Sequence, residues 1–257
     1  MILTIDSGNT NVVFALFDRG KLRASWRAAN DTRKTADEFG VWLSQLMELE
    51  NLTRTDVTGA IIASVVPAIV YSLRSLCIRY FSVEPLMLGD PRVDNGIKLL
   101  QERPEEVGAD RIANAVAAQK TYGGPLIVVD FGTATTFDVV TGDGAFAGGC
   151  ISPGINLSLE VLHMAAAQLP RVAIEPPPQV ICTSTVNAIK SGVFWGYMGL
   201  IEGMISRIQQ EYGAPMKVIA TGGLAPLFTR HTKAIHHLDS DLTLRGLEDI
   251  YLRNAKV

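Results

Sequence analysis

Apolar and polar residues alternate along the first part of the chain in patterns typical of short strands and amphipathic helices. Thr35 and Glu38, for example, have the spacing of a capping box and predict a helix that runs to about Leu49. The pattern as a whole predicts strands over residues 2–5, 12–17, 22–26, 59–65 and 85–88 and helices over residues 35–49 and 67–81. This order is typical of a mixed sheet with helices packed on its faces.

A similar order of elements begins again after a polar segment over residues 89–108 and a predicted helix over residues 110–122. The second series has predicted strands over residues 126–129, 136–140, 145–151 and 216–220 and helices over residues 154–167, 186–212 and 244–252. The repeat predicts two α/β domains of related topology with a cleft between them. We place the division between residues 1–117 and 118–257.

A short acidic turn occurs once in each half of the chain. The first copy reads Asp6-Ser7-Gly8-Asn9-Thr10-Asn11, and the second reads Asp130-Phe131-Gly132-Thr133-Ala134-Thr135. Each copy lies between two apolar runs, so each is predicted to be the turn of a β-hairpin. A carboxylate at a strand end can hold Mg²⁺, and a glycine lets backbone N–H groups approach a phosphate. These residue types also form ordinary turns, but the duplication favours a nucleotide-dependent phosphotransferase.

The composition is ordinary for a globular protein, with 47% hydrophobic and 19% charged residues. A net charge of −3 gives no reason to expect a nucleic acid or an acidic membrane surface as a partner. The three cysteines are far apart and lack metal-ligand spacing, which is typical of a reducing compartment. The longest apolar run, over residues 60–70, contains Pro67 and is too short to span a bilayer. No basic segment precedes the first strand, so we expect a soluble, cytoplasmic protein.

Five sequence blocks together resemble one known family. They lie at residues 6–11, 108–111, 130–135, 148–154 and 221–223. Their order and spacing are similar to those of the type III pantothenate kinases, a family of the acetate and sugar kinase, Hsp70 and actin superfamily. The resemblance implies two domains of the actin-like ATPase (ribonuclease H-like) type. It also implies ATP-dependent phosphorylation of pantothenate to 4'-phosphopantothenate, the first step of coenzyme A biosynthesis.

The resemblance implies a role for each candidate residue. Asp110 would be the general base, because an alkyl hydroxyl attacks phosphorus poorly unless a carboxylate accepts its proton. Contacts to pantothenate would come from Gly108, Ala109, Asp110, Arg111 and Thr185. Contacts to ATP and its Mg²⁺ would come from Asp6, Ser7, Gly8, Asn9, Thr10, Asn11, Val12, Val13 and Thr133. Asp130 would bind a monovalent cation, K⁺ or NH₄⁺, and the pocket would be completed by a second copy in a homodimer.

Several positions admit a purely structural interpretation. Asp110 and Arg111 could be a helix-start acid beside a solvated base, and Thr185 could be a helix N-cap. The pairs Gly148-Gly149 and Gly222-Gly223 could be ordinary turns, or places where the backbone closely approaches the substrate and the adenine. Four large apolar residues in the helix over residues 186–212 could form a buried core or a dimer interface, and the resemblance favours the interface: Phe194, Trp195, Tyr197 and Met198.

Two functional alternatives and one departure from the family pattern also follow from the sequence. The same fold could phosphorylate another small hydroxy acid or a sugar, or it could serve as a nucleotide-binding regulator without catalysis. The family often has a tyrosine shortly before the proline that precedes the block at residues 108–111, and it contacts pantothenate. Residues 97–104 contain no aromatic side chain, so this edge of the pocket is expected to differ.

Overall fold

The computed structural model describes residues 1–165 and 170–255, which group by their contacts into two compact units. The first unit contains Met1–Thr121 and the segment from Asp241 on, and the second contains Tyr122–Ser240. Among the helices of these described ranges, none is both long and apolar enough to cross a membrane. The end of the helix predicted over residues 154–167 lies outside the described residues; its described part is α4 (Ile155–Ala165).

The sheet of the first unit has five strands in the order β3-β2-β1-β4-β5. The strands are β1 (Ile2–Ser7), β2 (Asn11–Asp18), β3 (Lys21–Ala29), β4 (Gly59–Ser64) and β5 (Leu86–Met87). Strand β1 pairs antiparallel with β2 and parallel with β4, so Asp6 lies between Val13 and Ala63 in the sheet. The five strands predicted for this half of the chain are confirmed.

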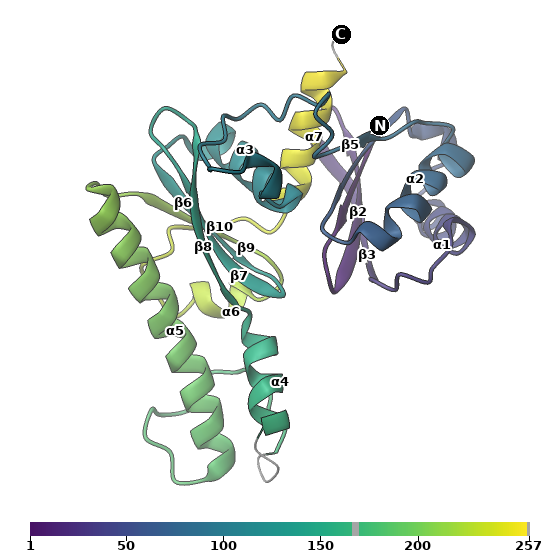
Figure 1. Cartoon of the computed structure of the whole chain (residues 1–257). Helices are drawn as coiled ribbons and strands as arrows, with labels where there is room; N and C mark the ends of the chain where they lie inside the picture. The colour runs from purple at the N-terminus through teal and green to yellow at the C-terminus, as the bar shows by residue number, and fades with distance from the viewer. Residues whose placement is uncertain (166–169, 256–257) are drawn as a thin grey trace. The chain divides into compact units, whose positions relative to one another are not determined.

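Helices cover both faces of this sheet (Figure 1). On one face lie α1 (Ala36–Leu49) and α2 (Pro67–Phe81), whose apolar side chains share a core with Phe14 of β2. On the other face lie α3 (Ala109–Tyr122) and α7 (Leu242–Asn254), which pack on Ile61 and Ala63 of β4. Successive strand residues point to opposite faces, which is why adjacent residues of β4 enter different cores.

The predicted capping box at the start of α1 is present. Thr35 Oγ1 accepts a hydrogen bond from Glu38 N at 3.3 Å, and Glu38 Oε2 accepts one from Thr35 N at 2.8 Å. The two bonds satisfy donors that a helix N-terminus otherwise leaves unpaired. This local interaction sets the first residue of α1.

The last helix, α7, packs in the first unit although it follows the second unit in the chain. Gly246 allows this, because a Cβ at that position would overlap the Ala113 carbonyl oxygen of α3. Thr243 Oγ1 also donates to Asn114 Oδ1 at 2.7 Å. The domain boundary at 117/118 stays a prediction, and the contact-defined units differ from it by assigning α7 to the first unit.

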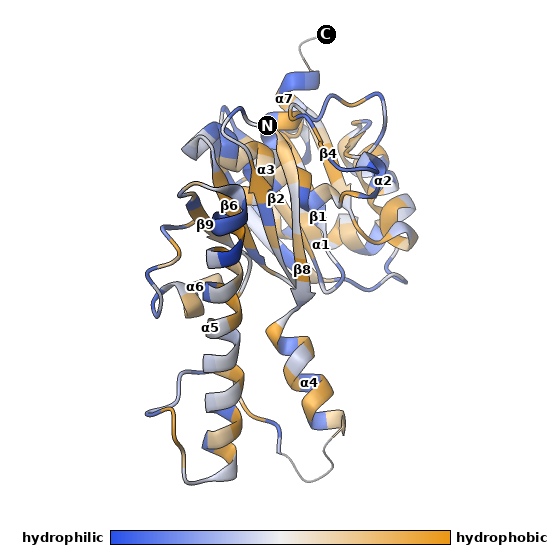
Figure 2. Cartoon of the chain, turned by 60° about the vertical axis from the view of Figure 1, so that its left-hand side comes forward, coloured by the Kyte–Doolittle hydropathy of each residue, from blue (hydrophilic) through white to orange (hydrophobic). Residues whose placement is uncertain are grey.

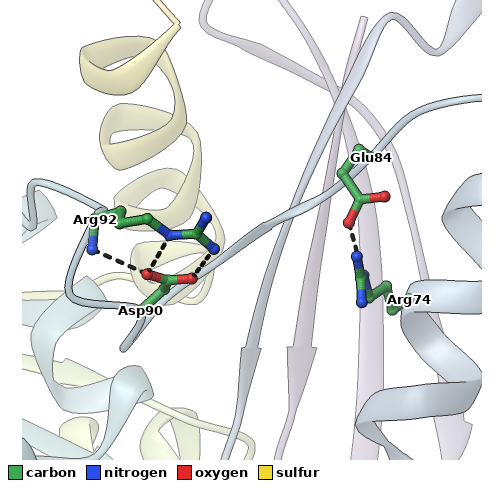
Figure 3. Close-up of polar contacts among 4 residues, drawn as sticks. All are labelled: Arg74, Glu84, Asp90 and Arg92. Atoms are coloured by element: carbon green, nitrogen blue, oxygen red, sulfur yellow. Dashed lines mark hydrogen bonds and ion pairs between the residues drawn. The ribbon is translucent and has the colours of Figure 1, made fainter.

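Ion pairs stabilise the chain on either side of β5. Asp90 accepts hydrogen bonds from Arg92 N at 2.9 Å, Nε at 3.0 Å and Nη2 at 2.6 Å (Figure 3). The bonds from the Arg92 side chain and backbone lower the pKa of Asp90 to about 2. Arg74 of α2 similarly contacts Glu84, just before β5, at 2.6 Å (Figure 3). The polar segment between β5 and α3 contains a short 3₁₀ helix, η2 (Pro104–Glu106), and leads directly into α3.

The second unit repeats the topology of the first. Its sheet order is β10-β9-β6-β7-β8. The strands are β6 (Leu126–Phe131), β7 (Ala134–Val140), β8 (Phe146–Pro153), β9 (Lys217–Thr221) and β10 (His237–Leu238). Strand β6 pairs antiparallel with β7 and parallel with β9, as β1 does with β2 and β4. The predicted structural repeat is therefore confirmed, although the two-residue strand β10 was not predicted.

Helices α5 (Thr185–Tyr212) and α6 (Ala225–Thr229) pack on one face of the sheet of the second unit. The long helix α5 and the short, unpredicted α6 share a core with β6, β7 and β9. Phe194, Tyr197 and Met198 are buried in this core, and Trp195 packs against it. The prediction of a dimer interface is wrong for Phe194, Tyr197 and Met198, because the core of the same unit buries them, and for the half-buried Trp195 it stays a prediction.

Candidate active site

The first acidic turn forms a tight loop at the end of the β1–β2 hairpin. Gly8 N donates to Asn11 O at 3.0 Å, which leaves Asn9 and Thr10 exposed at the tip. Asp6 is half-buried at the end of β1. We call residues 6–11 the first phosphate loop. Val12, the next residue, is fully buried in the core, so its side chain is not available to a ligand.

Asn30, a residue that the sequence analysis did not identify, holds the first phosphate loop. Its Nδ2 donates to Gly8 O at 2.5 Å and to Ser7 Oγ at 3.3 Å, and its backbone N donates to Thr10 O at 2.9 Å. Asn30 follows the last residue of β3, so these contacts depend on strand pairing. Polar residues are common at strand ends, so the sequence alone does not indicate that Asn30 has this role.

Asp110 lies in the first turn of α3, where the helix dipole favours a carboxylate. Its Oδ1 accepts a hydrogen bond from Arg111 N at 2.8 Å. The preceding Gly108 makes room for this carboxylate, since a Cβ on Gly108 would lie 2.6 Å from Asp110 Oδ1. Position 108 therefore favours glycine because the Asp110 carboxylate lies where a side chain would begin.

Burial raises the pKa of Asp110 above that of an ordinary aspartate. The hydrogen bond from the Arg111 backbone and the Arg111 charge act in the opposite direction but do not cancel the effect of burial. A carboxylate with a raised pKa is a stronger base in its ionised form. This property is what proton abstraction from an alcohol requires.

The start of α3 shares an apolar cluster with the strand beside β1. Ala109 is buried in the same cluster as Ala63 of β4, and Ala63 is the register neighbour of Asp6. The sequence predicted both motifs but not this shared cluster.

The second acidic turn forms the loop of the β6–β7 hairpin. Gly132 N donates to Ala134 O at 3.1 Å, and Thr133 is exposed. Asp130 pairs with Thr136 of β7 on one side and with Thr221 of β9 on the other. We call residues 130–135 the second phosphate loop, which has the position in the second unit that the first loop has in the first unit.

Two further glycine motifs meet the second phosphate loop. Gly154 N donates to Thr133 O at 3.0 Å, and a Cβ on Gly154 would overlap that oxygen. Gly222 has a φ of +93°, and a Cβ there would lie 2.6 Å from Asp130 Oδ1 and 2.7 Å from the Phe131 backbone. The blocks around residues 130, 154 and 222 thus form one structure. Gly222 thus approaches the second phosphate loop closely and lies in a bend of the chain, whereas its approach to the adenine stays a prediction.

Gly148 and Gly149 have a different role from the ones considered for them. They lie inside β8 rather than in a turn, and Gly149 faces the Phe137 carbonyl so closely that a Cβ would overlap it. The register of the β7–β8 pair changes between Val139 and Val140. These glycines therefore allow β8 to pair with β7 around an irregularity.

Tyr197 of α5 contacts the second phosphate loop from the face of the sheet that α5 covers. Its hydroxyl is hydrogen-bonded to Thr135 Oγ1 and also donates to Pro153 O at 3.3 Å. Burial raises the pKa of this phenol above its ordinary value, so it stays protonated. The contact joins the loop, the end of β8 and the long helix.

Thr185 is the first residue of α5 and is exposed. Ser184 is the N-cap, since its side chain accepts from Asn187 N at 3.4 Å, so the interpretation of Thr185 as the cap is wrong. At ~1.5 Å per residue, Thr185 lies roughly 18 Å along α5 from Tyr197. The start of α5 lies beside α4, beyond the end of the sheet (Figure 1). A single chain therefore does not bring Thr185 to the second phosphate loop.

The donor groups fit cations that bind oxygen. Asp6 and Asp130 each offer one carboxylate beside a loop of backbone groups, and Mg²⁺ in nucleotide sites usually takes one or two carboxylates plus phosphate oxygens. Among the described residues, no group of three or more His, Cys, Asp or Glu side chains is arranged to hold a metal ion. Any cation here would thus need oxygens from the backbone, water or a nucleotide.

Comparison with known proteins gives a consistent result. The family model described as type III pantothenate kinase matches residues 2–207. A type III pantothenate kinase of Paramagnetospirillum magneticum is 64% identical over 99% of this chain and 98% of its own. Another of Rhodospirillum rubrum is 63% identical over 99% of each chain.

Solved structures with low sequence identity share the fold. A Campylobacter jejuni protein of the Baf family of transcriptional activators has a TM-score of 0.60 and 22% identity, with 99% of this chain and 100% of that one covered. The activator of 2-hydroxyisocaproyl-CoA dehydratase from Clostridium difficile, with bound ADPNP, has a TM-score of 0.55 and 12% identity, with 100% and 97% covered. These likenesses confirm the predicted α/β fold of the actin-like ATPase type.

We predict that Gly222→Ala destabilises the second unit, because the new Cβ meets both the Asp130 carboxylate and the Phe131 backbone. The expected loss in the free energy of unfolding is about 2–4 kcal/mol, measured by denaturant unfolding. Gly213→Ala is the matched control, since Gly213 also has a positive φ of +79° but has open space around it. Equal losses in the two variants would mean that the contact with Asp130 adds nothing.

Proposed function

The chain belongs to the type III pantothenate kinase family, and we propose that Asp110 is the general base of its reaction. The enzyme is a kinase that transfers a phosphoryl group from ATP to pantothenate in coenzyme A biosynthesis. In the proposed step, the primary hydroxyl of pantothenate gives its proton to the Asp110 carboxylate as its oxygen bonds to the γ-phosphorus. The bond from that phosphorus to the bridging oxygen breaks, and ADP leaves.

The surroundings of Asp110 support this role. Burial raises its pKa and so increases its basicity, while the hydrogen bond from Arg111 N fixes the position of Oδ1. Gly108 keeps the space beside that oxygen open. A positioned base typically contributes 10²- to 10⁴-fold to the rate. The single observation that carries the assignment is this fit of Gly108 to the Asp110 carboxylate.

The remaining site residues are proposed from the family motifs and their placement. Residues 6–13 and Thr133 bind ATP, and Gly108, Ala109, Arg111 and Thr185 contact pantothenate, with Arg111 suited to its carboxylate. The exposed tips of the two phosphate loops support the first assignment. Asp6 would hold the Mg²⁺ that accompanies ATP, and this cation would supply positive charge to the phosphates. The absence of an aromatic residue over 97–104 leaves more of the pantothenate contacts to residues 108–111.

Asp110→Asn should lower kcat by roughly 10²- to 10⁴-fold without weakening ATP binding, because an amide has the same shape but cannot accept the proton. Pantothenate-dependent ADP release measures kcat, and a thermal shift with ATP measures binding. Asp249→Asn is the matched control, since Asp249 lies on α7 of the same unit, paired with Lys120. Wild-type turnover in Asp110→Asn would remove Asp110 as the base.

The pH dependence gives a second readout for the same assignment. Because the pKa of Asp110 is raised, the carboxylate becomes protonated, and turnover falls, at a higher pH than for an ordinary aspartate of pKa about 3.9. The acid limb of the kcat profile should disappear in the residual activity of Asp110→Asn. A limb that is the same in both enzymes would belong to another group.

We further propose a monovalent cation, K⁺ or NH₄⁺, at Asp130. The proposal is supported by the position of the Asp130 carboxylate beside two glycines, Gly132 and Gly222, which leave room around it. ADP release should be faster with K⁺ or NH₄⁺ than with Na⁺ at equal ionic strength. Asp130→Asn should abolish this difference, whereas equal rates in all three salts for the wild-type enzyme would contradict the site.

A homodimer is proposed from the surface of the second unit. Hydrophobic segments of α4 and the start of α5 lie side by side in the ribbon (Figure 2). Large apolar side chains are exposed on α4, at residues 180–181 and at the start of α5: Leu157, Val161, Leu162, Met164, Val180, Ile181 and Val186. Met164 and Ile181 are 69% and 85% exposed, which is unusual for such residues gathered in one region. Thr185 lies in this region, so a second copy that covers it could also bring Thr185 to a substrate pocket.

Helix α5 has a further feature that suits close packing with a second copy. Gly192, Gly196, Gly199 and Gly203 are spaced by four, three and four residues and therefore share one face. The first three have open space where a Cβ would be. Glycines inside a helix lower the stability of the folded chain. Close packing of a neighbouring chain against this face would explain why glycines are present here.

Gly196→Leu should convert the dimer to a monomer and reduce turnover, because leucine blocks close approach to α5. The open space at Gly196 means that folding of the chain itself should be unaffected. Sedimentation analysis gives the oligomeric state, and thermal unfolding checks the fold. A dimer that persists in the variant, or a wild-type monomer at assay concentration, would contradict the proposed interface.

The enzyme is proposed to act in the cytoplasm without a nucleic acid or membrane partner. Within the described ranges, Cys77, Cys150 and Cys182 form no disulfide with one another, which is typical of reducing compartments. The net charge of −3 also gives no electrostatic support for binding a polyanion.

A further inference from the structure

Asn30 contacts the first phosphate loop through both its backbone and its side chain. The Nδ2 group donates to Gly8 O at 2.5 Å and Ser7 Oγ at 3.3 Å, and the backbone N donates to Thr10 O at 2.9 Å. The three acceptors span the turn between β1 and β2. Asn30 therefore fixes the direction of two carbonyl groups in a loop whose tip is exposed.

The direction of a carbonyl group also determines the direction of the next N–H group. A trans peptide is planar, and its C=O and N–H bonds point in opposite directions. Because Gly8 O points toward Asn30, the N–H of Asn9 points away from Asn30. A backbone N–H group that points to solvent from a turn can bind an anion such as a phosphate.

The side chain of Asn30 is not explained by stability alone. Its Oδ1 is buried and has no hydrogen-bond partner among the residues that the structure describes. A buried acceptor without a donor destabilises the folded state. A small apolar side chain would avoid this cost, but it could not hold Gly8 O. The amide thus fits a role in loop geometry better than a role in packing.

We propose that Asn30 is a positioning residue for ATP, which turns the N–H of Asn9 toward the phosphates by holding the Gly8 carbonyl. This proposal rests on the proposed role of residues 6–13 in binding ATP. Asn30 itself touches no reacting atom. Its loss should therefore weaken the use of ATP and leave the pantothenate site unchanged.

Two variants test the proposal through the KM values for the two substrates. Asn30→Ala removes both Nδ2 bonds and keeps the backbone bond to Thr10; it should raise KM for ATP by roughly 5- to 20-fold. Asn30→Asp keeps the size of the side chain but places a carboxylate beside Gly8 O, so its KM for ATP should rise further. KM for pantothenate should stay within about twofold of wild type in both.

Asn254→Ala is the matched control, because Asn254 Nδ2 also holds two backbone carbonyl groups, Asp94 O at 3.0 Å and Ile250 O at 2.8 Å. It should change thermal stability without changing KM for ATP. If Asn30→Ala proves unstable, the same-size Asn30→Asp supplies the comparison. A KM for ATP in both Asn30 variants equal to that of the control would overturn the proposal.

Asn9→Pro separates this inference from the function of the loop, because proline removes the N–H group itself. If Asn9→Pro raises KM for ATP and the Asn30 variants do not, the loop binds ATP and Asn30 does not position it. If neither raises KM for ATP, the assignment of residues 6–13 fails as well. If both raise it, with KM for pantothenate unchanged, the proposal is supported.

Discussion

Two carboxylates of the candidate site each lie against a glycine at a distance that no side chain could occupy. A Cβ on Gly108 would lie 2.6 Å from Asp110 Oδ1, and a Cβ on Gly222 would lie 2.6 Å from Asp130 Oδ1. The other elements of the site depend on this close approach. The phosphate loops end strands whose pairing is fixed by the sheets, and the carboxylates can take their positions only because the neighbouring backbone is bare.

The sequence predicts the parts of this structure that depend on local interactions. Strand and helix positions follow from the spacing of apolar residues, and the capping box at Thr35 and Glu38 gives the start of α1. The two acidic turns are also local, so their hairpins could be predicted in both halves. The repeated topology then follows, because the same series of elements occurs twice along the chain.

Contacts between distant segments could not be predicted in the same way. Asn30 holds Gly8 across 22 residues, and nothing in the sequence around Asn30 distinguishes it from other polar residues at strand ends. The apolar residues of α5 are distributed around the helix, so the pattern could not show that Phe194 and Tyr197 face their own sheet. The exposed apolar side chains lie instead on α4 and the start of α5. Which face is covered depends on tertiary packing rather than on hydropathy.

The place of α7 has a consequence for synthesis of the chain. Ile61 and Ala63 of the first sheet are covered partly by Leu247 and Ile250, which follow the whole second unit in the chain. During synthesis of the second unit, this apolar surface of the first unit therefore stays exposed. Folding of the first unit can be completed only after α7 has been translated, so a product truncated before α7 would lack part of a core.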